Sequence, residues 1–118
     1  MKNLFLLITA IIFLLACNQE PVNLANLDNI DGKTVIKGEK DSYSGQVVTY
    51  YNNGKIKLEE FVKEGEKHGK HVNYYKSGKK KTEGEYKNGK RKGVWKWWSE
   101  KGDVDFKVNY SSTVSLRF

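Results

Sequence analysis

The chain has 118 residues and a formal net charge of +7 at pH 7. Apolar residues make up 38% of it and aromatic residues 13%, so a deep aliphatic core is poorly supplied and an extended sheet fits better. This length leaves room for one small domain, and a single cysteine excludes an intramolecular disulfide.

The N-terminal segment differs in composition from the rest. Lys2 precedes a nearly unbroken apolar run from Leu4 to Leu15 that contains no acidic residue. This order is typical of a secretory signal, and the run is too short to cross a ~30 Å hydrocarbon core as a helix. Residues 1–16 are therefore predicted to be a signal peptide that is cleaved before Cys17.

The four residues "LLAC", from Leu14 to Cys17, resemble the lipobox of bacterial lipoproteins. The resemblance implies a lipid on the thiol of Cys17 and attachment to the bacterial cell envelope, at the outer membrane if the host has one. Two or three acyl chains anchor a protein stably. The following segment is polar and rich in asparagine, and residues 17–32 are predicted to be a flexible tether of about 20 Å.

From residue 33 to residue 118 we expect one repeat domain, because the chain repeats itself every 24 residues. Such a period is typical of repeat architectures. Five columns carry the repeat: Gly45, Gly69 and Gly93; Tyr50, Tyr74 and Trp98; Gly54, Gly78 and Gly102; Gly65 and Gly89; and Val62, Tyr86 and Tyr110. Within each period, β-branched and aromatic segments end in glycine-bearing turns, which predicts consecutive β-hairpins.

Alternation within these segments predicts two faces of one antiparallel sheet with seven to nine strands, the last formed by Thr113–Phe118. Most apolar positions carry even numbers, so we expect them to share one packed face: Val48, Tyr50, Ile56, Leu58, Val62, Val72, Tyr74, Tyr86, Trp98, Val104, Phe106, Val108 and Tyr110. The opposite face is expected to be mostly polar.

The segment from Gly69 to Gly102 resembles the bacterial variant of the MORN repeat, whose units follow G-x-W-x-x-Y-Y-x-x-G. The matching residues are Gly69, Tyr74, Tyr75 and Gly78 in one unit, and Gly93, Trp95, Trp98 and Gly102 in the next. The resemblance spans roughly Lys33 to Tyr110 and implies an all-β fold: an elongated, single-layer antiparallel sheet of stacked β-hairpins. His71 stands where the motif has tryptophan, and Val62 where it has tyrosine.

The resemblance supplies no catalytic residue. Some relatives are labelled antitoxins of toxin–antitoxin systems, and MORN repeats elsewhere are linked to phospholipid binding and scaffolding. The two histidines, His68 and His71, are expected on opposite faces without a third metal ligand, and the paired acids lie among lysines that suit cross-strand ion pairs. We therefore expect no enzyme activity, metal, cofactor or small-molecule substrate; an envelope hydrolase would lack a residue set.

Two lysine-rich turns suggest contact with an anionic surface. The candidate residues are Lys79, Lys80, Lys81, Lys90, Arg91 and Lys92. The alternative is that these lysines keep wet turns soluble and protect the sheet edge from aggregation. Nucleic acid is not an expected partner, because the signal peptide directs the chain out of the cytoplasm.

Four aromatic residues fall on the expected polar face, namely Tyr51, Tyr75, Trp95 and Trp97. Exposed there, they would contact a protein partner or a glycan, since Trp and Tyr are enriched in contact hot spots. The alternative is that the sheet curls or its last strand covers them. The sequence thus predicts a non-enzymatic, lipid-anchored envelope module that binds a protein or an anionic surface through one sheet face; the alternative is an antitoxin or immunity protein that neutralises a cognate effector.

Overall fold

A computed structural model describes residues 20–111. The expected signal peptide, Cys17 and the expected strand at Thr113–Phe118 lie outside the described residues. The described elements are β1 (Val22–Asn23), the 3-10 turn η1 (Leu24–Asn26), β2 (Leu27–Ile30), β3 (Lys33–Ile36), β4 (Gly45–Tyr50), β5 (Ile56–Lys63), β6 (Glu66–Tyr74), β7 (Lys80–Lys87), β8 (Lys90–Trp98) and β9 (Val104–Asn109). Over this range no helix has the length and apolarity that crossing a bilayer requires.

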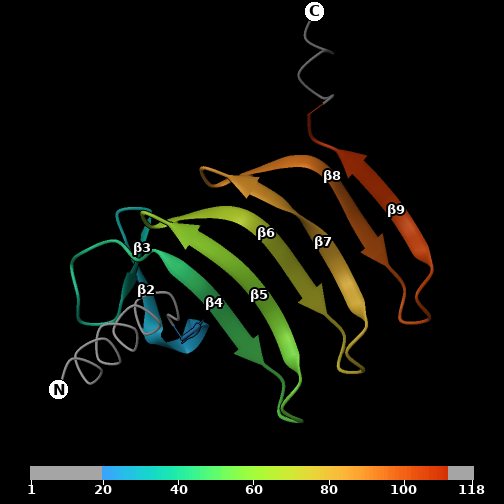
Figure 1. Cartoon of the computed structure of the whole chain (residues 1–118), viewed down its shortest axis with the longest axis horizontal. Helices are drawn as coiled ribbons and strands as arrows, with labels where there is room; N and C mark the ends of the chain where they lie inside the picture. Colours follow the sequence, from blue (N-terminus) through green and yellow to red (C-terminus); the bar gives the residue numbers. More distant parts are fainter. Residues whose placement is uncertain (1–19, 112–118) are drawn as a thin grey trace, which may run out of the picture.

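Seven strands form one sheet in the order β1-β4-β5-β6-β7-β8-β9, and β2 pairs with β3 in a separate hairpin (Figure 1). Strand β1 runs parallel to β4, and every other neighbouring pair is antiparallel. The expected all-β fold of stacked hairpins is confirmed. From β4 onward, sequence neighbours are sheet neighbours, which is what a chain of hairpins produces.

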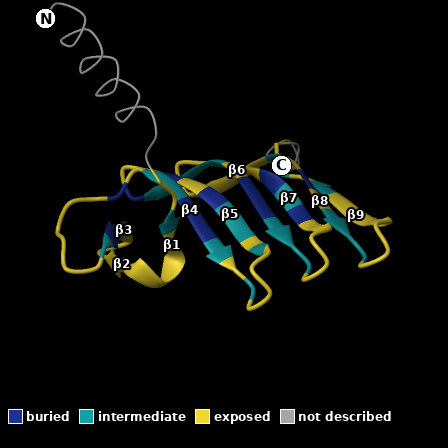
Figure 2. Ribbon diagram, turned by 60° about the horizontal axis from the view of Figure 1, so that its bottom comes forward, coloured by how far each residue is buried: buried dark blue, intermediate teal, exposed yellow. Residues whose placement is uncertain are grey.

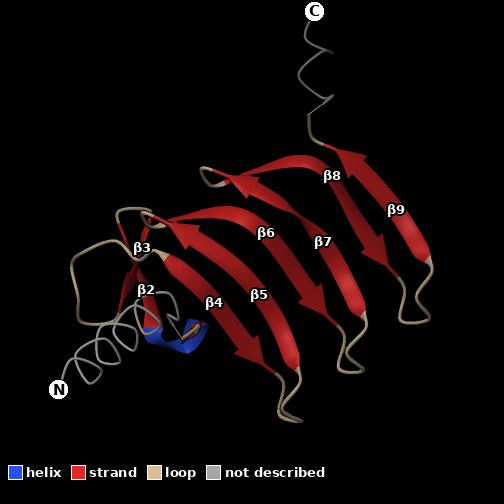
Figure 3. Ribbon diagram, in the orientation of Figure 1, coloured by secondary structure: helices blue, strands red, loops and turns tan. Residues whose placement is uncertain are grey.

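The strand connections gather at two opposite edges of the sheet. Figure 2 shows that most buried residues lie within the strands and that the turns are mostly exposed; the buried residues Tyr43 and Gly65 lie outside the strands. One edge carries the two-residue turns Glu64–Gly65 and Asn88–Gly89, in which both residues have positive φ, as type I′ hairpins require. The other carries the five-residue turns 51–55, 75–79 and 99–103 (Figure 3). We call these the short-turn edge and the long-turn edge.

The two faces of the sheet differ from the expected division into even and odd residues. Val47 pairs with Glu60, Glu60 with His71, and Trp95 with Val108, so odd residues of β4, β6 and β8 share a face with even residues of β5, β7 and β9. The prediction of one even-numbered packed face was therefore wrong. Alternation sets faces within a strand, but the register between strands depends on turn lengths and on β-bulges, which occur near the end of β4, β6 and β8.

We name the faces by their chemistry. The aromatic face carries Val47, Leu58, Glu60, Val62, His71, Asn73, Thr82, Tyr86, Trp95, Trp97, Phe106 and Val108. The charged face carries the cross-strand row Val48, Glu59, Val72, Glu83, Lys96 and Lys107. His71 and Trp95 are odd-numbered and were expected on the polar face. They lie instead on the aromatic face, which is the better covered of the two.

A small apolar core lies where the N-terminal elements cover the aromatic face over β4 and β5. Leu27 and Tyr43 pack there against Val47 and Val62. Residues 20–32, expected to belong to a flexible tether, are folded here: β1 pairs with β4 and Leu27 is buried. Because the apolar side chains of this segment cover the end of the sheet, the folded domain begins before the expected boundary at residue 33.

Candidate functional site

The centre of the aromatic face is a cluster of rings around Trp95. The Trp95 indole lies against the backbone of Gly84 so closely that a Cβ atom there would lie 2.1 Å from Cδ2 of the indole. Its Nε1 donates to the carbonyl of Glu85 over 3.1 Å. The rings of Tyr86 and His71 lie 5.0 and 5.5 Å from it, centroid to centroid. A glycine inside a strand here marks the close approach of a side chain.

Arg91 lies over this cluster on the solvent side. Its guanidinium is 4.6 Å from the centroid of Trp95 and 5.5 Å from that of Tyr110, and Nη1 donates to the Tyr110 hydroxyl over 2.7 Å. Hydrogen bonds to Tyr86 and Tyr110 raise the pKa of Arg91. Arg91, expected as an anion contact, therefore covers rings above which residues 20–111 place no second layer of structure.

The cluster corrects the expectation of an exposed aromatic stripe. Trp95 is only 1% exposed, so its indole is not available to a partner. Trp97 is half-buried and stacks on Phe106 at 4.6 Å between centroids and 12° between planes. Phe106 is 53% exposed, although sequence reasoning placed it on the packed face. The accessible aromatic surface here is the pair Trp97 and Phe106.

Beside the rings lies a buried polar group. Nδ1 of His71 is 2.9 Å from Oε2 of Glu60, and Nε2 is 3.0 Å from the side-chain nitrogen of Asn73. Because an ionised Glu60 can only accept, Nδ1 carries the proton and Nε2 accepts from Asn73. Burial raises the pKa of Glu60, but the hydrogen bond from His71 and the charge of Lys67 at 3.3 Å outweigh burial and lower it. His71 is thereby satisfied where the motif has tryptophan.

The tyrosines Tyr51 and Tyr75 lie on the long-turn edge and link successive hairpins. The Tyr51 hydroxyl donates to the carbonyl of Tyr74 over 2.6 Å, and the Tyr75 hydroxyl donates to that of Trp98 over the same distance. These bonds hold each ring in place, with one side in contact with the next hairpin. Neither tyrosine joins the Trp95 cluster, so the four expected contact residues do not form one surface.

Two lysines lie over these fixed rings. Lys57 Nζ is 5.6 Å from the centroid of Tyr51, and Lys81 Nζ is 5.6 Å from that of Tyr75. Hollows of about 210, 390 and 430 Å³ follow the edge between the hairpins. We call this surface the Tyr–Lys groove; it is lined by Tyr51, Tyr75, Lys57, Lys76 and Lys81, with Asn73 and Thr82 at its smallest hollow and Glu100 at the end next to the third hairpin.

A comparison with known families gives these units a name. The sequence matches the MORN repeat variant over residues 43–64, 67–88 and 91–112, which is more than half of the chain. The chain belongs to the MORN repeat variant family. No curated protein and no solved structure matches the chain significantly.

Each MORN repeat corresponds to one hairpin of the main sheet: β4–β5, β6–β7 and β8–β9. The Tyr–Lys groove therefore lies between repeats, because each tyrosine binds the repeat that follows it. Sequence reasoning missed Lys57 as a contact residue. The signal for Lys57 was present, since Lys57 and Lys81 are 24 residues apart and form a column of the repeat.

The expected basic patch is divided by the MORN hairpins. Lys79, Lys80 and Lys81 lie where β7 begins, at the long-turn edge, whereas Lys90, Arg91 and Lys92 lie where β8 begins, at the short-turn edge. Measured along β7 at 3.3 Å per residue, Lys80 and Lys90 lie about 23 Å apart, and Lys81 and Lys92 about 13 Å apart. The two runs are close in sequence, but strand β7 places them at opposite edges, so the six residues do not form one continuous patch.

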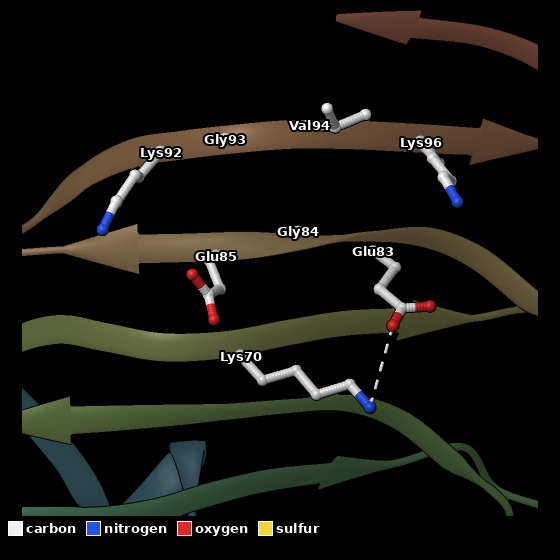
Figure 4. Close-up of a pocket in the computed structure, with 8 residues that line it drawn as sticks. All are labelled: Lys70, Glu83, Gly84, Glu85, Lys92, Gly93, Val94 and Lys96. Carbon is white, nitrogen blue, oxygen red and sulfur yellow. Dashed lines mark ion pairs between the residues drawn. The ribbon is translucent and has the colours of Figure 1, made fainter. Parts of the chain in front are cut away.

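The charged face has a hollow of about 370 Å³ across β6, β7 and β8 (Figure 4). Gly84 and Gly93 leave it open, and acidic and basic side chains alternate around it. Glu83 pairs with Lys70 at 3.7 Å and with Lys80 at 2.7 Å. Both lysines lower the pKa of Glu83, and the hydrogen bond from Lys80 has the larger effect. Its lining mixes both signs of charge, and Lys70–Glu83 is the ion pair recorded between two of the lining residues. No group of three possible metal ligands occurs within residues 20–111.

Proposed function

We propose that this MORN-repeat protein is a non-enzymatic binding module, attached to a bacterial envelope membrane by lipid on Cys17, that holds a protein partner at its long-turn edge. The observation that carries the proposal is the position of residue 20 at the other edge of the sheet, from which the chain runs back toward Cys17.

That position follows from strand pairing. Strand β1 runs parallel to β4 with Val22 opposite Val47, so Glu20 lies toward the beginning of β4. Strand β4 begins at the short-turn edge, since Gly45 pairs with Val62. Cys17 precedes Glu20 by three residues, a reach of at most about 11 Å. A lipid on Cys17 would thus keep the short-turn edge near the membrane and the long-turn edge away from it.

The surface that faces away from the membrane in this arrangement is the Tyr–Lys groove. Its rings are fixed by hydrogen bonds within the sheet, which lowers the entropy that a partner has to offset on binding. Tyrosine is also among the residues enriched at protein interfaces. The groove combines fixed tyrosine rings with lysine side chains, which suits recognition of another protein rather than catalysis.

The lipid and the partner are tested separately. Mass spectrometry of the protein from membranes should find a lipid-modified Cys17, and the Cys17→Ser variant should move to the soluble fraction. For the partner, a photo-crosslinking residue at Ser77, on the long-turn edge, should give a specific crosslinked protein in living cells. The same residue at Asn88, in a turn of the short-turn edge, is the matched control. Equal crosslinking from both positions, or none from Ser77, would contradict the proposed binding edge.

A further inference from the structure

We infer that the Tyr–Lys groove binds an acidic segment of the partner, with carboxylates at Lys57 and Lys81; this inference rests on the proposed function. The two ammonium groups have equivalent positions in successive repeats, since each lies 5.6 Å from the centroid of a tyrosine ring. Lys57 belongs to β5 and Lys81 to β7, two strands apart, which corresponds to about 9.6 Å across the sheet.

The groove lysines differ from four other lysines of the sheet in their ion pairing. Lys33, Lys67, Lys70 and Lys80 each pair with a glutamate at 2.8, 3.3, 3.7 and 2.7 Å, respectively. In the described part of the chain, no carboxylate pairs with the groove lysines Lys57, Lys76 and Lys81. Cations gathered in this way attract an anion from outside. The Thr82 hydroxyl lies beside the smallest hollow and offers an additional hydrogen-bond donor.

The third repeat ends the groove. Where the first two repeats have tyrosine and lysine, it has Ser99 and Asp105, and Glu100 and Asp103 lie in the same turn. Their negative charges repel a ligand that carries carboxylates. The groove therefore accepts a short acidic segment across the first two repeats and stops it at the third.

A short peptide fits this pattern better than a nucleic acid or a membrane. A nucleic acid needs cations that follow a continuous line of phosphates, but here tyrosine rings interrupt the lysines and three acids follow them. The membrane that holds the lipid of Cys17 would lie at the opposite edge. Tyrosine rings beside the lysines offer apolar contact to the stems of aspartate or glutamate residues.

The test uses the full protein purified in a neutral detergent, so that the result does not depend on whether Cys17 carries lipid. Isothermal titration with a hexa-aspartate peptide should show saturable binding, whereas a hexa-asparagine peptide should show none. The variant Lys57→Gln/Lys81→Gln should bind hexa-aspartate about tenfold more weakly. The matched control Lys87→Gln/Lys90→Gln removes the same charge at the short-turn edge and should change affinity by less than about twofold.

A second measurement does not depend on the variants. Hexa-aspartate should shift the ring resonances of Tyr51 and Tyr75 in the unmodified protein and leave those of Tyr110 in place. Equal weakening in the two double variants would show diffuse charge attraction and overturn the inference. It would also be overturned if inorganic polyphosphate bound more tightly than hexa-aspartate at the same lysines, or if hexa-aspartate did not bind at millimolar concentration. Each of these outcomes can be interpreted even if Cys17 carries no lipid.

Discussion

Val47 and Trp95 occupy the same column of the repeat, two units apart, and both are almost fully buried, at 0% and 1% exposure. They are covered by different means. Val47 lies under the N-terminal elements, in contact with the cluster of Leu27 and Tyr43. Within the described residues, Trp95 is instead enclosed by neighbouring rings and by Arg91.

The difference shows how a single-layer sheet buries its face without a second sheet. At one end, additional chain within residues 20–44 supplies apolar cover. At the other, large side chains cover one another, which demands a glycine beneath Trp95 and a cation above it. The middle column position, His71, uses a third means, a hydrogen bond to buried Glu60. Removing each kind of cover should therefore lower the free energy of unfolding in its own way.

The largest effect is expected for Trp95→Ala. Removing a fully buried indole leaves a cavity among rings that cannot collapse onto it, at a cost of about 3–5 kcal/mol in the free energy of unfolding. Leu27→Ala, at the rim of the other core, should cost about 2–3 kcal/mol. Urea unfolding followed by circular dichroism measures both. A loss below about 1 kcal/mol for Trp95→Ala would contradict the view that its ring cluster carries the C-terminal half of the sheet.

The second prediction concerns the glycine beneath that indole. Gly84→Ala would place a methyl group 2.1 Å from Cδ2 of Trp95, so the indole has to move, at a cost of about 1–3 kcal/mol. In a Trp95→Val background the space is open, and the same substitution should cost much less. Unfolding midpoints of the four proteins form a double-mutant cycle. Additive effects of the two substitutions would show that the contact does not determine the need for glycine.

Much of the fold follows from local signals. The 24-residue period, the hairpins and the turn glycines such as Gly54 and Gly78 are readable because each turn needs positive φ at a defined position. Which residues share a face of the sheet could not be predicted in the same way. Each bulge adds one residue to one strand, so the relation between neighbouring strands depends on pairing that the alternation of a single strand does not contain.

The candidate site was predictable only in part. Tyr51, Tyr75 and Lys81 do border one groove, but Trp95 is buried because Gly84, on another strand, makes room for it. A glycine inside a strand was the available signal, and its meaning depends on which residue faces it. The folded start of the domain was likewise hidden, because Leu27 stands in a polar segment and finds its contacts only in the assembled sheet. Lipid modification of Cys17 stays a prediction.

The third prediction tests the hydrogen bond between His71 and buried Glu60. The pKa of Glu60 is lowered in the folded protein, so its ionised form stabilises the fold above the unfolded-state pKa of 4.5, and this contribution is lost as pH falls through the folded-state pKa. Glu60→Gln should cost about 1–3 kcal/mol at pH 7, and the difference from the unmodified protein should shrink toward pH 3. Urea unfolding across this pH range measures it. A difference that is constant with pH would contradict a role for the ionised carboxylate.

The last prediction concerns the cation above the rings. Arg91→Gln keeps a polar side chain of similar reach but removes the charge over Trp95 and the donor to Tyr110, at an expected cost of about 0.5–2 kcal/mol. Lys92→Gln, at the adjacent position on the other face, is the matched control and should have little effect. Because the guanidinium lies on the indole, Arg91→Gln should also change the fluorescence of the tryptophans. If both substitutions cost the same and fluorescence did not change, Arg91 would act only as one more surface charge. The C-terminal half of the sheet would then depend on ring packing alone.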